Sequence, residues 1–308
     1  MKFCSFVLSN QKSSWGVALN DSNVADLGAL APSLLDWIRS GKSLTPDLVG
    51  QAPTRPVAEL KMMACIPQPP SMRDGYAFRQ HVEAARRNRG VPMIEEFDLF
   101  PTFYFTNHQA VFGGGMIEVQ DLQLDQLDFE LEAAVVIGKK GKNIPASKAD
   151  EFIFGYTIMN DLSARKVQME EMKLSLGPAK GKDFATVLGP WLVTRDELEA
   201  QRIPGTHGER YDLEMSAYVN DVQVSRGNLK DMTWTFAQIL ERVSYGAWVH
   251  PGDVIGSGTV GTGCFLELNG SKITQNQWLK PGDKVLCKIS GLGQVENTFR
   301  RAEATLQV

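Results

Sequence analysis

Short apolar runs, each ended by glycine, proline, asparagine or aspartate, recur along most of the chain. Such runs are typical of β-strands, whereas apolar residues that recur every three or four positions are typical of helices. The pattern predicts strands at residues 3–8, 15–19, 117–122, 129–137, 152–159, 214–220, 253–256, 265–269 and 284–290. It predicts helices at residues 33–40, 45–50, 73–89, 147–152, 163–174 and 235–243.

Proline also divides the chain. Residues 66–70 read Ile-Pro-Gln-Pro-Pro, which excludes a helix because proline fixes the backbone angle φ and lacks an amide proton. We therefore predict a small N-terminal domain at residues 1–65 and a larger domain at residues 66–308. The strands and helices predicted after residue 65 do not alternate regularly, so the expected fold class is α+β with a large mixed or antiparallel sheet.

The composition of the chain argues against several classes of function. The 308 residues carry 32 Lys and Arg against 36 Asp and Glu, a net charge of -4. A nucleic-acid-binding protein needs a basic surface to displace counterions, so we expect no nucleic-acid partner. The apolar run at residues 1–8 is too short for a signal sequence or a membrane span, and the cysteines lack the spacing of a zinc knuckle or a disulfide framework. We expect a cytoplasmic protein with no membrane partner.

Two glutamates occupy same-face positions of a predicted strand. Glu130 and Glu132 are two residues apart, so their side chains point to one face while Phe129 and Leu131 point to the other. An isolated pair of this kind is typical of a solvated strand face. This pair, however, runs into the apolar stretch 133–137, where two charges without partners would be costly. A hard cation such as Mg²⁺ or Ca²⁺ would remove that cost.

A third carboxylate, Asp161, closes the run of residues 154–161 just before a predicted helix. Taken alone, it suits a helix N-cap equally well. Arg165 and Gln168 are one helical turn apart and therefore share a face of that helix. This face is suited to an anionic substrate beside the metal, because arginine binds carboxylates through two parallel hydrogen bonds.

Lys182, His81 and Glu267 are further candidates. Lys182 lies in a Gly-rich segment without the P-loop order, and alone it suits a solvated surface lysine. His81 alone suits a structural role on a helix, but beside a metal and oriented by a carboxylate it is a natural general base. Glu267, in the apolar run 264–268, is the candidate carboxylate. The Gly-rich turn 256–263 suits either a flexible hairpin loop or a set of backbone N–H groups that bind an anion.

Together these stretches resemble the fumarylacetoacetate hydrolase family in the family's own order over residues 66–308. Residues 74–81 (DGYAFRQH) resemble its D-x-Y-x-x-x-Q-H segment, which implies Asp74 as a metal ligand, Tyr76 as a substrate contact and His81 as the base. The E-x-E and M-N-D motifs of the family imply three more metal ligands, namely Glu130, Glu132 and Asp161. The remaining motifs match Arg165, Gln168, Lys182, Thr186, Thr259 and Glu267, and Tyr104 matches a substrate-binding tyrosine.

The resemblance implies a fumarylacetoacetase-like catalytic domain with a large mixed sheet rolled into a sandwich-like arrangement. It implies a metal-dependent hydrolase that cleaves a C–C bond of a β-diketo or acylpyruvate-type acid, chemistry that belongs to aromatic catabolism. His81 and Glu267 then activate water, while Arg165 and Lys182 stabilise negative charge. It further implies a divalent cation (Mg²⁺ first, with Ca²⁺ or Mn²⁺ as alternatives), a small anionic substrate and a homodimer.

Two alternatives stay open. An isomerase or decarboxylase of 2-oxo or 2-hydroxymuconate-type acids uses the same metal-enolate chemistry, and a non-catalytic binding protein would keep the metal ligands without turnover. Gly75, Leu162 and Met172 depart from the pattern of the members that cleave fumarylacetoacetate. We therefore expect a different natural substrate.

Overall fold

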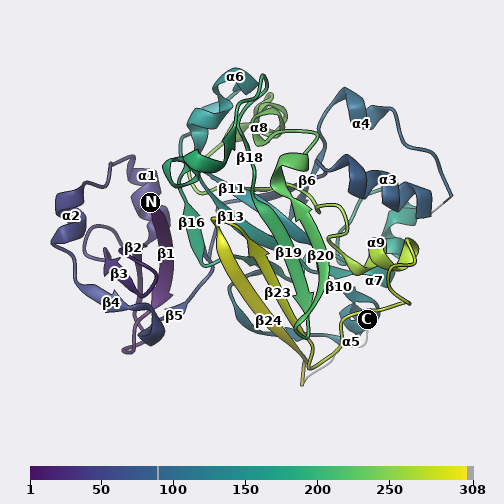
Figure 1. The fold of residues 1–308 in the computed structure, drawn as a ribbon, viewed down its shortest axis with the longest axis horizontal. Helices are drawn as coiled ribbons and strands as arrows, with labels where there is room; N and C mark the ends of the chain where they lie inside the picture. Colours follow the sequence, from purple (N-terminus) through teal and green to yellow (C-terminus); the bar gives the residue numbers. More distant parts are fainter. Residues whose placement is uncertain (89, 304–308) are drawn as a thin grey trace.

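Two β-sheets stacked face to face form the framework of the protein, and helices lie around their ends (Figure 1). The computed structural model describes residues 1–88 and 90–303. The larger sheet has 13 strands in the order β4-β3-β2-β1-β16-β13-β11-β22-β6-β7, with β15 beside β13, β8 beside β15 and β5 beside β1. Its strands are β1 Lys2–Val7, β2 Ser13–Ala18, β3 Asn23–Asp26, β4 Thr54–Pro56, β5 Lys61–Met62, β6 Met72–Gly75, β7 Phe103–Thr106, β8 Val111–Phe112, β11 Leu131–Ile137, β13 Ile153–Asp161, β15 Thr186–Leu188, β16 Trp191–Val193 and β22 Val254–Gly256.

The second sheet has five strands in the order β20-β19-β23-β24-β9. They are β9 Gly115–Val119, β19 Glu214–Val219, β20 Val222–Asn228, β23 Lys284–Ile289 and β24 Gly293–Arg301. Both sheets are mixed, because the pairs β22–β6, β15–β8 and β24–β9 are parallel whereas the other neighbours are antiparallel. The predicted α+β class with large mixed sheets is therefore confirmed.

Short two-stranded ribbons and helices complete the described part of the chain. The ribbons pair β10 Leu127–Asp128 with β14 Ser163–Ala164, β12 Gly141–Lys142 with β21 Trp248–Val249, and β17 Arg202–Ile203 with β18 Arg210–Tyr211. The α-helices are α1 Leu34–Ser40, α2 Pro46–Gly50, α3 Arg79–Asn88, α4 Glu96–Leu99, α5 Asp121–Leu124, α6 Ala146–Ala149, α7 Arg165–Glu171, α8 Phe236–Ser244 and α9 Phe265–Gly270. Within the described residues, no helix has the length and apolar composition needed to span a lipid bilayer.

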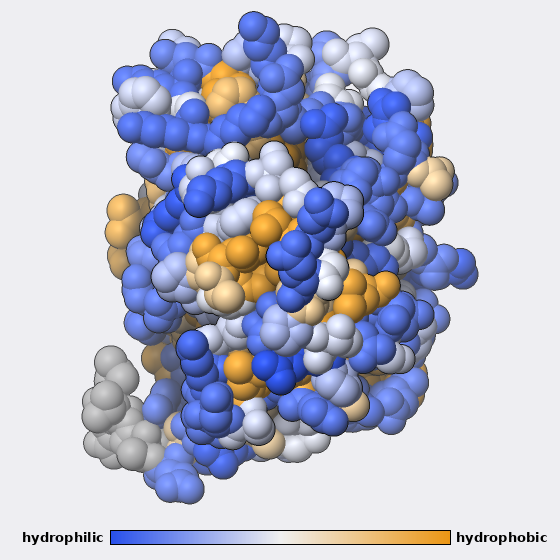
Figure 2. All heavy atoms as spheres, turned by 90° about the vertical axis from the view of Figure 1, so that its left-hand side faces the viewer, coloured by the Kyte–Doolittle hydropathy of each residue, from blue (hydrophilic) through white to orange (hydrophobic). Residues whose placement is uncertain are grey.

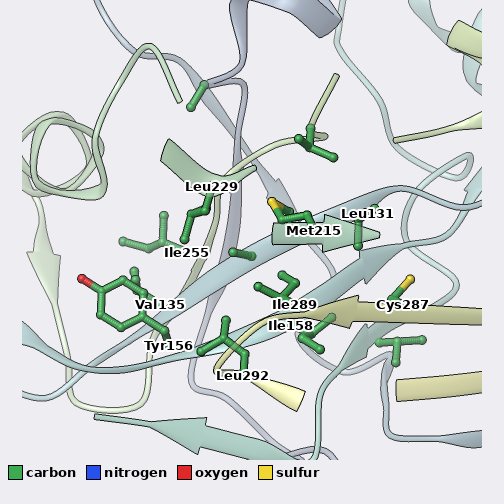
Figure 3. Packing of buried hydrophobic residues seen from close by; sticks show 14 of the residues in the cluster. Leu131, Val135, Tyr156, Ile158, Met215, Leu229, Ile255, Cys287, Ile289 and Leu292 are labelled. Atoms are coloured by element: carbon green, nitrogen blue, oxygen red, sulfur yellow. The ribbon is translucent and has the colours of Figure 1, made fainter. Parts of the chain in front are cut away.

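The main core lies between the two sheets. Figure 3 shows Leu131 and Val135 of β11 packed with Met215 of β19 and Ile289 of β23. Every residue of β11 is buried, because its alternate residues face a second core on the opposite side of the sheet. A strand buried on both faces reads as a continuous apolar run, which is why residues 133–137 predict a strand without alternation.

The N-terminal strands extend the larger sheet. β1 pairs antiparallel with β16 through Lys2 and Val193, so the first strands join the sheet that carries β11 and β13. Figure 2, which faces the N-terminal side, shows a mostly hydrophilic surface with separate small groups of apolar atoms. A domain boundary at residue 65 stays a prediction, and residues 304–308 of the predicted second domain lie outside the described residues.

Two secondary-structure predictions are wrong. Residues 72–75 form strand β6 and the helix begins only at Arg79, because pairing with β22 and β7 decides the conformation of that segment. The predicted end of this helix, Arg89, lies outside the described residues. Residues 265–270 form helix α9 where the apolar run predicts a strand. Asp128 accepts hydrogen bonds from the N–H groups of Phe265 and Leu266, which satisfies donors in the first helical turn.

Candidate active site

Four carboxylate side chains come together near the ends of β6 and β13 and the start of β11. Side chains on a strand alternate between its faces, so a residue two positions away faces the same way. By this alternation Asp74, Glu132 and Asp161 share a face with residues of the N-terminal core, namely Met72, Ala134 and Met159. Glu130 precedes β11, and oxygens of all four carboxyl groups lie within 4.8 Å of one another. We call these four residues the carboxylate cage.

Two glycines leave room for Asp74 in the cage. Gly256 lies beside Asp74 in the sheet, and a Cβ atom at this position would meet the Asp74 Oδ1 atom at 2.3 Å. Gly258 has a φ of +79°, and its N–H donates a hydrogen bond of 3.1 Å to the same oxygen. Glycine adopts this backbone angle without strain. The Gly-rich segment 256–263 is therefore mostly buried and contacts the cage through a backbone N–H group.

The cage is buried, and its charges perturb one another. Burial raises the pKa of Asp74 to about 7, and the nearby charge of Asp161 adds to this rise. Burial and the charge of Asp74 hold the pKa of Glu132 well above its ordinary value. Burial alone would raise the pKa of Glu130, but Arg165 and Lys182 outweigh it and lower that pKa. Without a further cation, the Asp74 and Glu132 side of the cage therefore carries more negative charge than its surroundings stabilise.

Two buried cations occupy one side of the cage. The Lys182 ammonium donates to Glu130 and, at 2.8 Å, to Asp161 Oδ2. The Arg165 guanidinium donates to Glu130 Oε1 at 2.6 Å. Burial would lower the pKa of Lys182, but Asp161 and Glu130 raise it, so this lysine stays charged. Lys182 is only 4% exposed, and its solvated-surface alternative is wrong.

A divalent cation fits the remaining side of the cage. The buried oxygens Glu132 Oε2 and Asp161 Oδ1 have no hydrogen-bond partner among the described residues. A buried carboxylate oxygen without a partner is costly, and a cation would compensate for it. Asp74, Glu130, Glu132 and Asp161 offer only oxygen ligands, which suit a hard cation such as Mg²⁺, Mn²⁺ or Ca²⁺ better than a thiolate-preferring metal.

His81 and Glu267 form a buried pair next to the cage. His81 lies on α3 and Glu267 on α9, and His81 Nδ1 is 2.7 Å from Glu267 Oε2. The other Glu267 oxygen accepts the N–H of Thr262 at 2.9 Å. Segment 256–263 thus contacts both features, because its Gly258 N–H bonds to Asp74 in the cage. The geometry resembles a nucleophile-activating or water-activating pair, in which a carboxylate orients an imidazole.

The other sequence candidates lie around these two features. The ring of Tyr76 meets the His81 ring edge-on at 5.8 Å between centroids. Tyr104 donates from its hydroxyl to Asp161, and Thr259 lies 3.4 Å from a Glu132 oxygen. Gln168 accepts from Arg165 at 3.0 Å and makes no contact with the cage among the described hydrogen bonds. Thr186 lies on β15 opposite Asp161.

Asp128 is a residue of the site that the sequence analysis missed. It is fully buried and accepts from Arg165 Nε at 2.8 Å, while it also accepts the first N–H groups of α9. It thereby links the guanidinium at the cage to the helix that carries Glu267. The sequence does contain a pattern that points to Asp128, because Asp128, Glu130 and Glu132 stand at alternate positions and so share a face of an extended segment.

The chain is similar in sequence to known proteins. The family model described as fumarylacetoacetate (FAA) hydrolase C-terminal matches residues 71–300. An uncharacterised protein of Staphylococcus haemolyticus is 35% identical over 170 residues, which cover 55% of this chain and 50% of that protein. An uncharacterised protein of Staphylococcus aureus is 33% identical over 170 residues, which cover 55% and 51%. The matched part thus spans about half the length of these curated relatives.

Solved structures share the whole fold. A fumarylacetoacetate hydrolase from Exiguobacterium antarcticum superposes with a TM-score of 0.77 at 25% identity, over 98% of this chain and 100% of that chain. A probable 2-hydroxyhepta-2,4-diene-1,7-dioate isomerase from Mycobacterium abscessus gives a TM-score of 0.75 at 24% identity, over 99% and 100%. A maleylpyruvate hydrolase from Sphingobium gives 0.73 at 17% identity, over 98% and 100%.

Proposed function

Because the chain belongs to the fumarylacetoacetate hydrolase family, we propose that it is a metal-dependent hydrolase that cleaves a C–C bond of a β-diketo or acylpyruvate-type acid. The observation that carries the proposal is the His81–Glu267 pair at 2.7 Å, which is hydrogen-bonded to the same Gly-rich segment 256–263 that contacts the carboxylate cage. Hydrolysis needs a base for water as well as a site for the anionic acid. The His81–Glu267 pair and the carboxylate cage support the two roles.

His81 would act on water through its second ring nitrogen. When Nδ1–H donates to Glu267, Nε2 is left as an acceptor. Nε2 takes a proton from water, and the water oxygen adds to the acyl carbonyl carbon of the substrate. Glu267 holds the imidazole in this tautomer and stabilises its positive charge after the transfer.

The proposed reaction needs only water and the substrate as reactants. After the water oxygen has added, the bond between the acyl carbon and the methylene carbon breaks, and its electron pair passes to the methylene carbon as an enolate. A proton returned to that carbon completes the reaction. The products are a carboxylic acid and a 2-oxo acid such as pyruvate.

The charged groups of the cage suit the developing enolate. Lys182 and Arg165 place two buried positive charges beside Glu130, where a substrate oxyanion would be stabilised in a water-poor environment. Asp74, Glu130, Glu132 and Asp161 would hold the divalent cation, and Mg²⁺ is our first choice over Mn²⁺ and Ca²⁺. When bound, such a cation supplies Lewis-acid stabilisation of negative charge on the oxygens of the oxo acid.

An isomerase or decarboxylase of 2-oxo or 2-hydroxymuconate-type acids is the second candidate. The observation in its favour is that the cage with Lys182 and Arg165 is complete without the His81–Glu267 pair, and enolate chemistry alone needs no base for water. A role in aromatic catabolism is part of either proposal.

Removal of the metal tests the proposal. With acylpyruvates and 2-hydroxymuconate-type acids as substrates, an excess of EDTA should abolish turnover, and Mg²⁺ or Mn²⁺ should restore it. Release of pyruvate and a carboxylic acid, measured by liquid chromatography, would establish hydrolysis. Release of carbon dioxide or an isomerised acid would favour the second candidate, and turnover that survives EDTA treatment would contradict a metal-dependent mechanism.

We also propose a homodimer that takes a small anionic substrate. Twofold symmetric dimers are the commonest assemblies of soluble enzymes. Light scattering should report twice the chain mass of 34.0 kDa across a wide range of concentrations. A mass of one chain throughout that range would refute the dimer.

A further inference from the structure

A cavity of about 290 Å³ is lined in part by Tyr76, the residue after β6. Its other walls come from α3, from α4 and the residues beside it, and from Thr102 just before β7. Small-molecule sites commonly measure about 300–1,000 Å³. A cavity at the low end of this range has room for part of a substrate rather than for all of it.

The strand register places this cavity in line with the cage. Asp74 of β6 lies opposite Tyr104 of β7 in an antiparallel pair. Tyr76 directly follows β6 and Thr102 directly precedes β7, so the register of the pair brings them to the same end of these strands. Tyr76 and Thr102 both line the cavity. The Tyr76 ring also meets the ring of His81 at 5.8 Å between centroids, so the cavity adjoins the candidate base.

The walls of the cavity are apolar and anchored. Half of the eight lining residues are aliphatic or phenylalanine, namely Val82 of α3, Ile94, Phe97 of α4 and Phe100. The backbone oxygen of Phe97 accepts a hydrogen bond of 2.9 Å from the Trp234 indole, so α4 is tied to the segment before α8. α3 and α4 lie close together beside β6 (Figure 1). Val82 and Phe97 are buried, whereas Ile94 and Phe100 are 37% and 38% exposed, so the cavity has an apolar wall with a rim that reaches solvent.

The charges at the rim do not favour a second carboxylate. Arg86 and Glu96 both line the cavity and have opposite signs. Arg86 Nε donates to the backbone oxygen of Pro92, so part of its hydrogen-bonding capacity is already used. A negatively charged tail would gain from Arg86 but would be repelled by Glu96, and it would also lose its hydration among the aromatic side chains.

We propose that this cavity binds the acyl end of the substrate and selects an apolar, uncharged tail of a few carbon atoms or a phenyl ring. The proposal rests on the proposed function, because it assumes that the 2-oxo acid end binds at the cage. It assigns Tyr76, Val82, Ile94 and Phe97 to recognition of the acyl group. The preferred substrate is then a monocarboxylic acylpyruvate rather than a diacid.

Calorimetric titration of the Mg²⁺-loaded protein with unreactive ligands tests this. Oxamate carries the 2-oxo acid end alone, N-butyl oxamate adds an apolar tail, and N-(3-carboxypropyl) oxamate adds a charged one. Burial of each methylene is worth roughly a factor of three to four. N-butyl oxamate should therefore bind at least about 30-fold more tightly than oxamate, and the charged ligand at least about tenfold more weakly than N-butyl oxamate.

A substitution in the cavity tests whether the cavity causes the tighter binding of the butyl tail. Ile94 is 37% exposed, so Ile94→Asp should fold, and it should lower the ratio of N-butyl oxamate to oxamate affinity at least about tenfold. Val222→Asp, at a 65% exposed position of β20, is the matched control and should keep the wild-type ratio. If oxamate binds but the butyl tail adds nothing, or the charged tail binds best, the inference is wrong while the proposed function stands. If none of the three ligands binds, both are wrong.

Discussion

Glu132→Gln should abolish metal binding and lower kcat by at least about 10³-fold, since a Lewis-acid cation contributes several kcal/mol to such reactions. The substitution keeps the shape of the side chain but removes a charge from the buried cage. Glu132 is 0% exposed, and its Oε2 atom has no hydrogen-bond partner among the described residues. The metal-free variant should nevertheless be at least as stable as the metal-free wild type. Burial and the charge of Asp74 already disfavour the ionised form of Glu132, as its raised pKa indicates.

Thermal unfolding with and without Mg²⁺ separates these effects. At a concentration 100 times the dissociation constant, Mg²⁺ should stabilise the wild type by roughly 2.7 kcal/mol and leave Glu132→Gln unchanged. Glu151→Gln, which neutralises an exposed carboxylate outside the cage, should respond to Mg²⁺ as the wild type does. A Glu132→Gln protein that still gains stability from Mg²⁺ would show that the cage is not the metal site.

His81→Ala should keep metal and oxamate binding and yet lose about 10²- to 10⁴-fold in kcat, the usual contribution of a general base. The substitution removes the Nε2 acceptor for the proton of water and leaves the cage residues unchanged. Glu267→Gln should be impaired in the same step, but less severely, because Glu267 orients the ring and does not itself take the proton.

Pre-steady-state measurement of pyruvate release checks this prediction. His250→Ala is the matched control, because His250 is exposed and its replacement should leave kcat unchanged. A His81→Ala protein within about tenfold of the wild type would fall below the loss expected for a general base. The isomerase or decarboxylase candidate, which needs only the cage with Lys182 and Arg165, would then be preferred.

Much of the candidate site could be predicted because its signals are local. Glu130 and Glu132 share a face in any extended segment, whatever packs around it. Likewise, Arg165 and Gln168 contact each other at 3.0 Å because a helical turn separates them in any α-helix. The continuous apolar run 133–137 similarly predicts a strand buried on both faces, and β11 is such a strand.

Other features depend on contacts between distant segments. The apolar run 264–268 is compatible with a strand or with a buried helix. Helix α9 is favoured because the Asp128 carboxylate accepts hydrogen bonds from the N–H groups of the first helical turn. Residues 72–75 form a strand because β22, about 180 residues later in the chain, pairs with them. The role of Asp128 also depends on distant segments, because its partners are Arg165, 37 residues later, and the first residues of α9, 137 and 138 residues later.

Local patterns in the chain are enough to predict the types of residue in the site, the faces on which neighbouring residues lie and the family to which the motifs belong. The contact of His81 with Glu267, 186 residues away, and the approach of Asp74 to the cage beside Gly256 depend instead on how distant segments pack. Periodicity reports which side of an element is apolar but not which element covers that side. Strand order and helix packing make that choice, because they bury the apolar faces against one another and leave the acidic residues together at one end of the sheet.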